Sequence, residues 1–152
     1  MTVLHHVQVG CPGGSEPASR SFYGDLLGLT EVPKPPELAK RGGVWFRGEG
    51  YELHVGVEED FVPAQKAHPA FLVPDAEALA SRLSDAGVDV TWDSNFPGYR
   101  RFHTHDPHGN RVEILTSAPR PKPAAGATQD QPGPGSVRRR RSGRYGEGWL
   151  LA

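Results

Sequence analysis

The hydrophobic and polar positions of residues 3–57 predict one secondary-structure element after another. Residues 3–9 (VLHHVQV) alternate as a strand does. A helix is expected next, because Ser15 offers an N-cap, Pro17 suits the first turn and Gly28 ends the pattern. Its apolar face is formed by Phe22, Tyr23, Leu26 and Leu27. Three further strands are expected at residues 29–33, 43–48 and 51–57.

Residues 68–116 repeat this order. A strand is predicted at residues 68–73 (HPAFLV), and Asp75 is expected to cap a helix that Gly87 ends. The apolar positions of this helix recur at helical spacing: Ala76, Leu79, Ala80, Leu83 and Ala86. Three strands are predicted at residues 88–92, 99–105 and 110–116. The repeated order predicts an α+β fold built from two copies of one module, at about 3–57 and 68–116.

The duplication places side chains that can bind a metal at matching positions. His6 and His68 each lie at the start of the first strand of a module. His54 and Glu113 each lie four residues after a glycine, in the last strand of a module. Imidazole and carboxylate groups suit a divalent transition metal that keeps open positions for a substrate. A single histidine in a strand is more often an ordinary hydrogen-bonded residue, but four residues in symmetric positions predict a metal site.

The period of two in a strand predicts which residues share a face with these four. The expected faces are His6, Gln8 and Gly10; Glu52, His54 and Gly56; and Arg111, Glu113 and Leu115. His5 is the rival of His6, but its side chain points to the opposite face. His103 and His105 form an H-x-H pair close to His108, but residues 106–110 (DPHGN) are typical of a turn. These last three histidines are not expected to be ligands.

Composition limits the kind of protein. The chain has 152 residues, 36% hydrophobic and 23% charged, which is enough for one buried core. The single cysteine, Cys11, excludes an intramolecular disulfide, is expected to be a small buried residue, and favours a reducing, cytoplasmic location. The N-terminus has neither a basic start nor a long apolar run, so neither a signal peptide nor a membrane span is expected.

Charge marks the expected end of the folded domain at residue 117. The net charge of the chain is −1, but residues 117–152 carry seven basic and two acidic side chains. Residues 118–152 are rich in Pro, Gly and Arg and have no hydrophobic period, so a disordered tail is expected. The run Arg138–Arg141 has no aromatic residues interleaved with it, which favours a solvated tail over a nucleic-acid site.

Four stretches resemble the vicinal oxygen chelate superfamily, which includes glyoxalases, bleomycin-resistance proteins and extradiol dioxygenases. They are LHHVQV (4–9), SFYGDLLGLTEV (21–32), HPAFLVPD (68–75) and DPHGNRVEIL (106–115). The resemblance covers residues 3–116. It implies two βαβββ modules whose mixed sheets form a U-shaped cup around one divalent metal ion, with His6, His54, His68 and Glu113 as the ligands.

Within this superfamily the ligand set distinguishes activities. Glyoxalase-type enzymes fill all four positions, whereas dioxygenases and fosfomycin enzymes resemble a triad of His6, His68 and Glu113. Bleomycin-resistance proteins have no metal set and bind a drug. The expected function is therefore a metal-dependent lyase or isomerase of glyoxalase type for a small vicinal-oxygen substrate, with Zn, Ni, Fe, Mn or Co as the metal. An iron(II)-dependent dioxygenase and a metal-free binding or resistance protein are the alternatives.

The expected mechanism is proton removal beside a carbonyl whose developing charge a metal stabilises. Glu113 is expected to be the base and His54 the second catalytic residue, with Glu52 a weaker candidate. Arg47 or Arg101 is expected to pair with a substrate carboxylate. The residues expected to line the pocket are Gln8, Trp45, Arg47, Phe71, Trp92, Arg101 and Phe102. Residues 33–43 are expected to form a mobile flap. Members of the superfamily build the cup either within one chain or between two chains, and a homodimer is expected here.

Overall fold

The structure is a computed structural model that describes residues 1–119. Residues 120–152, which make up nearly all of the predicted tail, lie outside the described residues. The strands are β1 (His6–Cys11), β2 (Thr30–Val32), β3 (Val44–Gly48), β4 (Tyr51–Val57), β5 (Ala70–Leu72), β6 (Thr91–Asp93), β7 (Tyr99–His105) and β8 (Arg111–Ser117). The helical segments are α1 (Glu16–Ser19), the π-helical η1 (Arg20–Leu26), α2 (Pro36–Ala39) and α3 (Ala76–Asp85).

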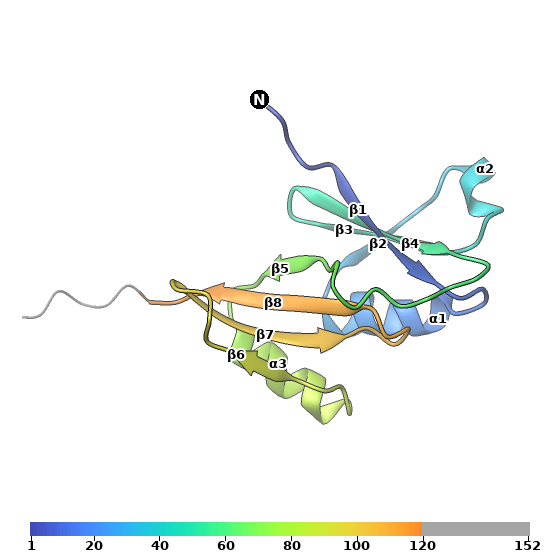
Figure 1. Cartoon of the computed structure of the whole chain (residues 1–152). Coiled ribbons are helices and arrows are strands. Elements are labelled where there is room, and N and C mark those ends of the chain that lie inside the picture. The colour runs from blue at the N-terminus through green and yellow to red at the C-terminus, as the bar shows by residue number, and fades with distance from the viewer. Residues whose placement is uncertain (120–152) are drawn as a thin grey trace, which may run out of the picture. The chain divides into compact units, whose positions relative to one another are not determined.

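The strands form two four-stranded sheets with the same topology. Sheet 1 has the order β1-β4-β3-β2, and sheet 2 has the order β5-β8-β7-β6. In each sheet the first and last strands of a module pair in parallel, β1 with β4 and β5 with β8, and the other pairs are antiparallel. The predicted α+β fold of two βαβββ modules is confirmed. The two sheets do not close into one cup within the chain (Figure 1).

Each sheet has one face packed against helices and one open face. The core contains residues of both modules, including Phe22 and Tyr23 of η1, Leu83 of α3, and Phe46, Leu53, Phe102 and Ile114 of the strands. The strand register confirms the predicted faces, since Gln8 pairs with His54 and His103 pairs with Glu113. Polar side chains therefore gather on the two open faces, where a site can form.

The helix starts differ from the prediction at one of two positions. Asp75 caps α3 as expected, because its Oδ1 accepts a hydrogen bond from the Ala78 amide at 3.0 Å. Ser15 stands before α1 but does not cap it with its side chain. Its hydroxyl instead donates to the Pro12 carbonyl at 2.5 Å. Among the described residues, no helix has the length and apolarity needed to cross a membrane.

The turn between β7 and β8 joins the two modules. The buried carboxylate of Asp106 accepts hydrogen bonds from the Tyr23 hydroxyl at 2.8 Å and from the Asn110 side-chain amide at 2.9 Å. The same Asn110 amide donates to the Gly10 carbonyl at 2.8 Å. His108 lies 2.7 Å from the hydroxyl of Ser19. The motif that the sequence indicated as a turn is therefore also a buried polar link between modules.

Candidate metal centre

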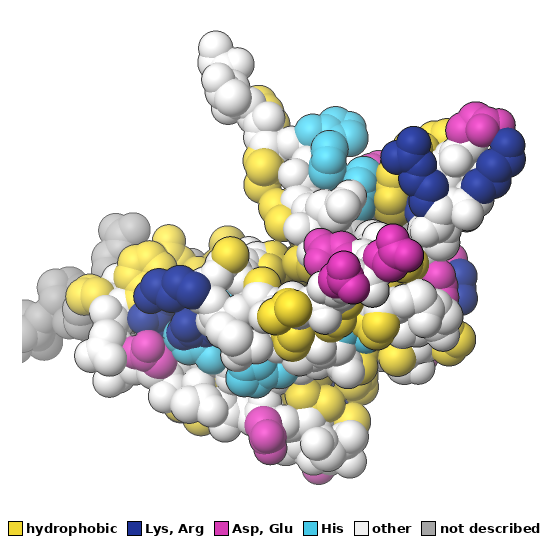
Figure 2. All heavy atoms as spheres, turned by 45° about the vertical axis from the view of Figure 1, so that its right-hand side comes forward, with side chains coloured by type: hydrophobic (Ala, Val, Ile, Leu, Met, Phe, Trp, Pro, Cys, Tyr) yellow, Lys and Arg dark blue, Asp and Glu magenta, His cyan; other side chains and the backbone are white. Residues whose placement is uncertain are grey.

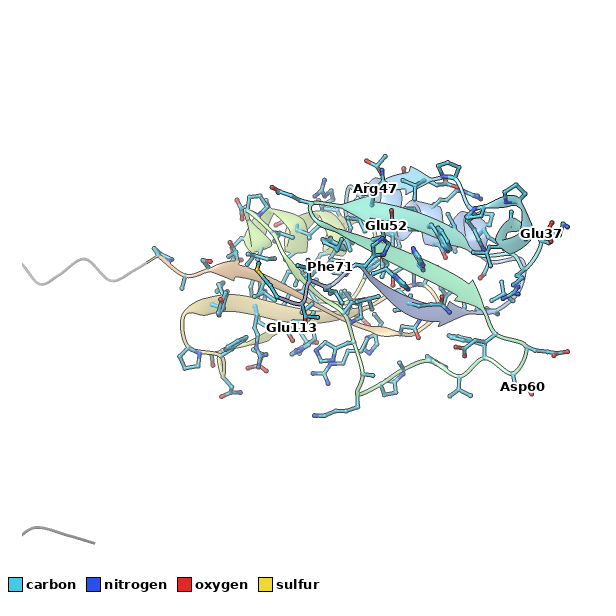
Figure 3. The ribbon with its side chains drawn as sticks, turned by 90° about the horizontal axis from the view of Figure 1, so that it is seen from above. Glu37, Arg47, Glu52, Asp60, Phe71 and Glu113 are labelled. Carbon is cyan, nitrogen blue, oxygen red and sulfur yellow. The ribbon has the colours of Figure 1, made fainter. Side chains whose placement is uncertain are left out.

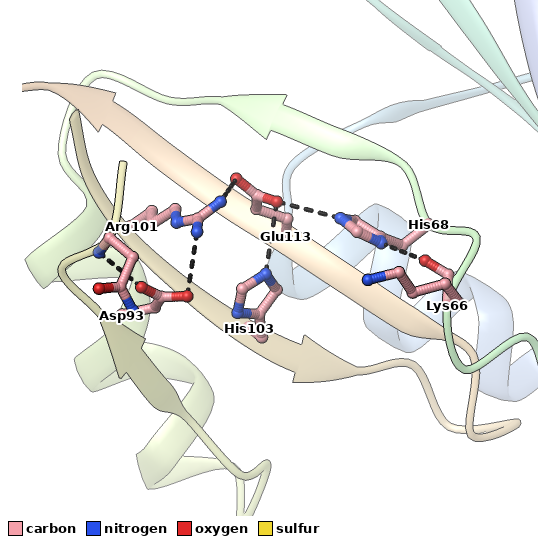
Figure 4. Close-up of polar contacts among 7 residues, drawn as sticks. Lys66, His68, Asp93, Arg101, His103 and Glu113 are labelled. Atoms are coloured by element: carbon pink, nitrogen blue, oxygen red, sulfur yellow. Dashed lines mark hydrogen bonds and ion pairs between the residues drawn. The ribbon is translucent and has the colours of Figure 1, made fainter. Parts of the chain in front are cut away.

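Glu113 is the centre of a polar cluster on the open face of sheet 2. It lies on β8 and is 5% exposed. Its Oε2 atom lies 3.0 Å from Nε2 of His68 and 3.4 Å from Nε2 of His103 (Figure 4). One ligand atom from each of these three residues lies within 4.8 Å of the others. Among the described residues they are the one group of three or more metal-ligand side chains.

The hydrogen bonds of His68 favour a cation at this place. Nδ1 of His68 lies 2.8 Å from the Lys66 carbonyl, which can only accept, so Nδ1 carries the proton. In the neutral imidazole Nε2 is then an acceptor, yet it faces the carboxylate of Glu113. Two acceptors at 3.0 Å need a proton or a metal ion between them. The backbone carbonyl that fixes the ring is also the partner that metal-bound histidines commonly have.

Charged neighbours keep Glu113 ionised. Its Oε1 atom accepts from Arg101 at 3.1 Å, and the same guanidinium donates to Asp93 at 3.0 Å. Burial favours the neutral acid, but the hydrogen bond from Arg101 and a proton shared with His68 outweigh it and lower the pKa of Glu113. Burial, together with the charge of Arg111, lowers the pKa of His103. A carboxylate beside two imidazoles is a donor set that fits a divalent transition metal.

A second cluster lies on the open face of sheet 1. The ring of His54 stacks on Trp45, with centroids 3.8 Å apart, and on His6, with centroids 4.3 Å apart. His6 is exposed, and its Nδ1 atom lies 3.0 Å from Nδ1 of His5. Since β1 and β3 flank β4, the register holds the three stacked rings in one row.

Glu52 connects His54 to Arg47 in this cluster. Its Oε2 atom lies 3.0 Å from Nε2 of His54, and its Oε1 atom accepts from Arg47 at 2.7 Å. The hydrogen bonds from His54 and Arg47 lower the pKa of Glu52 to about 2. A carboxylate that is so weakly basic is a poor proton acceptor, and its contact with Nε2 fixes the orientation of the His54 ring.

The chain brings together only part of the predicted ligand set. His68 and Glu113 meet in sheet 2, and His6 and His54 meet in sheet 1. Figure 3 shows Glu52 on the first sheet and Glu113 on β8 of the second, and Figure 2 shows the histidines in two separate areas. The sequence analysis considered His103 as part of an H-x-H pair and set it aside, yet the structure brings it beside His68 and Glu113. Counting outward from the turn at residues 106–110 gives the signal, because an antiparallel hairpin centred on His108 pairs residue 103 with residue 113.

The predicted lining residues divide between the two faces of the sheets. Gln8, Trp45 and Arg47 lie on the open face of sheet 1, and Arg101 lies on the open face of sheet 2. Phe71 and Phe102 belong to the buried core on the helix side of sheet 2, and Trp92 packs half-buried against that core. Their strand positions have the opposite parity to Glu113 and Arg101, and a lone aromatic residue does not reveal which face it occupies.

The matching modules and the two polar clusters define the class of protein. The chain belongs to the Glyoxalase/Bleomycin resistance protein/Dioxygenase superfamily, whose family profile matches residues 4–114. The resemblance found in the sequence is thus confirmed. No curated protein matches the chain.

Solved structures of relatives agree with this family. The chain is 43% identical to a glyoxalase family protein from Bacillus anthracis, with a TM-score of 0.75 over 78% of this chain and 97% of that one. It is 27% identical to the oxidase ChaP-H2, with a TM-score of 0.60 over 78% of this chain and 96% of that one. Lactoylglutathione lyase from Agrobacterium tumefaciens is 20% identical, with a TM-score of 0.59 over 76% and 94%, and shows the fold alone.

Proposed function

We propose that the protein is a divalent-metal-dependent enzyme of glyoxalase type, a lyase or isomerase for a small substrate with two adjacent oxygens. One observation carries the proposal. Nε2 of His68 and Oε2 of Glu113 approach to 3.0 Å, although the proton of His68 is fixed on its other nitrogen. His103 lies beside the same carboxylate oxygen. The family supports the proposal, since it includes lyases and oxidases.

The side chains divide the work between holding a metal and moving a proton. His68, His103 and Glu113 would hold the metal ion, which when bound supplies a Lewis acid for two substrate oxygens. Arg101 occupies Oε1 of Glu113, so this carboxylate is held in place rather than free to accept a proton. We therefore assign the base to His54. Its Nε2–H donates to Glu52, which leaves Nδ1 to accept a proton from the substrate.

A second copy of the chain would complete the site. The two clusters lie on the open faces of separate sheets, and a sheet that is open on one side leaves a substrate exposed to water. In a homodimer with twofold symmetry, the sheet 1 face of one copy can cover the sheet 2 face of the other, which forms two equal sites. His6 of the second copy would then be a further ligand, and His54 of that copy would face the substrate.

Metal content tests the proposal directly. Elemental analysis of untagged protein is expected to give about one metal ion per chain. Glu113→Ala should lose the metal and His103→Ala should bind it more weakly, because both change the donor set. His54→Ala should keep the metal and lose turnover of 2-oxoaldehyde or related substrates. His105→Ala is the matched control, since this exposed histidine lies on the same strand two residues from His103.

Absence of metal under several loading conditions would overturn the enzyme proposal and leave a metal-free binding or resistance protein. An iron(II)-dependent dioxygenase is the second candidate. It is favoured by the set of two histidines and one carboxylate in sheet 2, which suits non-haem iron(II). Oxygen consumption by the iron(II)-loaded protein with catechol would support this candidate, and its absence with an active zinc or nickel form would support the lyase or isomerase.

A further inference from the structure

A pocket over the open face of sheet 1 is lined by aromatic rings on the side of the sheet and by two cations on the other side. Its volume is about 410 Å³, and it lies between that face and the segment of residues 33–43 that contains α2. His6, His54 and Trp45 form the wall on the sheet. Lys34 and Arg41 come from the segment, one before and one after α2. The pocket thus contains the proposed base and two cations.

These two cations have no carboxylate partner in the part of the chain that the structure describes. No acidic residue lines the pocket, and neither Lys34 nor Arg41 forms an ion pair there. Their basic neighbours are different. Lys40 pairs with Glu37 at 2.7 Å, and Arg47 pairs with Glu52 at 2.7 Å. These two neighbouring cations are paired, whereas Lys34 and Arg41 form no ion pair among the described residues. Figure 2 shows basic side chains on the projecting part of the molecule around α2.

Backbone contacts hold Lys34 at the pocket, whereas Arg41 is exposed. The ammonium group of Lys34 donates to the Gly42 carbonyl and lies 5.9 Å from the centre of the Trp45 ring. The Gly43 amide donates to Glu16 at 2.8 Å, which anchors the end of the segment beside Arg41. Lys34 is half-buried. The charge of Glu16 acts on Lys34 without forming an ion pair with it, and the pocket itself supplies no carboxylate, so a bound anion would add a charge-assisted contact.

From this geometry we infer that the substrate carries an anionic group, a carboxylate or a phosphate, which Lys34 and Arg41 bind beside the reacting oxygens. The inference rests on the proposed function for the position of those oxygens near His54. Lys34 and Arg41 supply charge-assisted hydrogen bonds to either kind of anion. Trp45 and His6 stack on the two faces of the His54 ring, so this ring presents only its edge, with its nitrogen atoms, to a ligand.

Two probes that differ by one carboxylate test the inference. Catechol and 3,4-dihydroxybenzoate share the adjacent oxygens, and only the second is an anion with a carboxylate. Titration calorimetry on the full chain, with zinc and without metal, is expected to show at least about tenfold tighter binding of 3,4-dihydroxybenzoate. The double variant Lys34→Gln/Arg41→Gln should remove this preference. Lys40→Gln is the matched control, since Lys40 lies in the same segment and does not line the pocket; it should keep the preference.

The result that overturns the inference is equal binding of the two probes by the wild type, or a preference that survives in the double variant. If the protein binds no zinc but still binds 3,4-dihydroxybenzoate more tightly than catechol, the inference holds and the proposed function is wrong. If the protein binds zinc but binds the two probes equally, the proposed function stands and the inference is wrong. Competition identifies the anion, and both outcomes support the inference: stronger displacement by inorganic phosphate than by acetate at equal concentration indicates a phosphate, and equal displacement indicates a carboxylate.

Discussion

Arg101 determines which oxygen of Glu113 faces the histidines. The guanidinium binds Oε1 at 3.1 Å and is itself held by Asp93 at 3.0 Å, so Oε2 is turned toward His68 and His103. A metal ligand held in this way loses little freedom on binding, which is the general effect of outer partners on metal affinity. The sequence indicated Arg101 as a substrate-binding residue, and we propose from these contacts that it positions Glu113 instead.

Arg101→Gln should therefore lower metal affinity by about 10- to 100-fold while leaving the fold intact. Competition with a chromophoric chelator measures the affinity, and circular dichroism checks the fold. Arg100→Gln is the control, because Arg100 lies next in sequence and pairs with Glu77 on the opposite side of the strand. Equal metal affinity in the two variants would show that Arg101 does not orient the ligand.

Glu16 contributes stability that depends on pH. The hydrogen bond from the Gly43 amide lowers the pKa of Glu16 below its ordinary value of 4.5. A carboxyl whose pKa is lower in the folded state stabilises the fold at pH values above its unfolded pKa, and this contribution is lost as the pH falls through the folded pKa. Glu16→Gln should thus lower the thermal midpoint most at pH 6–7, and the difference from wild type should shrink below about pH 4.5. A difference that stays constant with pH would contradict this account.

Only some features of the candidate site could be predicted from the sequence. The period of two placed Gln8 with His6, His54 with Glu52, and Glu113 with Arg111 on common strand faces. The position of His103 beside Glu113 depends on pairing between strands, which a single strand pattern does not contain. The stacking of His54 between His6 and Trp45 likewise arises from three neighbouring strands.

At the scale of elements, the strands were predicted better than the first helix. All eight strands in the described part of the chain fall at predicted places, because alternation and glycine turns mark them locally. The first helix splits into α1 and the π-helical η1, and Ser15 turns to the Pro12 carbonyl. Phe22 and Tyr23 of η1 are buried in the core, and the helical period of the sequence does not specify a π-helical hydrogen-bond pattern.

The segment around α2 ends at a glycine that no other residue can replace without strain. Gly43 has φ +80°, and a Cβ there would lie 2.2 Å from the Val55 carbonyl oxygen. Gly43→Ala should destabilise the protein by about 3 kcal/mol or more in urea unfolding, through both the left-handed backbone and the clash. Gly50→Ala is the control, because its φ of +78° is similar and nothing lies within 4 Å of its Cβ position. Equal losses in the two variants would show that the clash is relieved.

At the scale of the whole molecule, the separate open faces make the dimer testable by mixing. His6→Ala and Glu113→Ala change different modules, and each should weaken metal binding alone. If each site uses sheet 1 of one copy and sheet 2 of the other, unfolding and refolding the two variants together restores intact residues at about a quarter of the sites. Metal content after dialysis measures this recovery. A mixture that holds only the average of the two variants would place the whole site within one chain.

The contacts of the turn at residues 106–110 bear on whether the two modules can be separated. The duplicated sequence invites a cut between the modules, in residues 58–67, to give two independent halves. Tyr23 and the Gly10 carbonyl, however, satisfy Asp106 and Asn110 of the other half. A cut would leave a buried carboxylate and amide without their partners and would open a shared apolar core. The two modules therefore repeat in sequence but depend on each other for stability, and neither half is expected to fold alone.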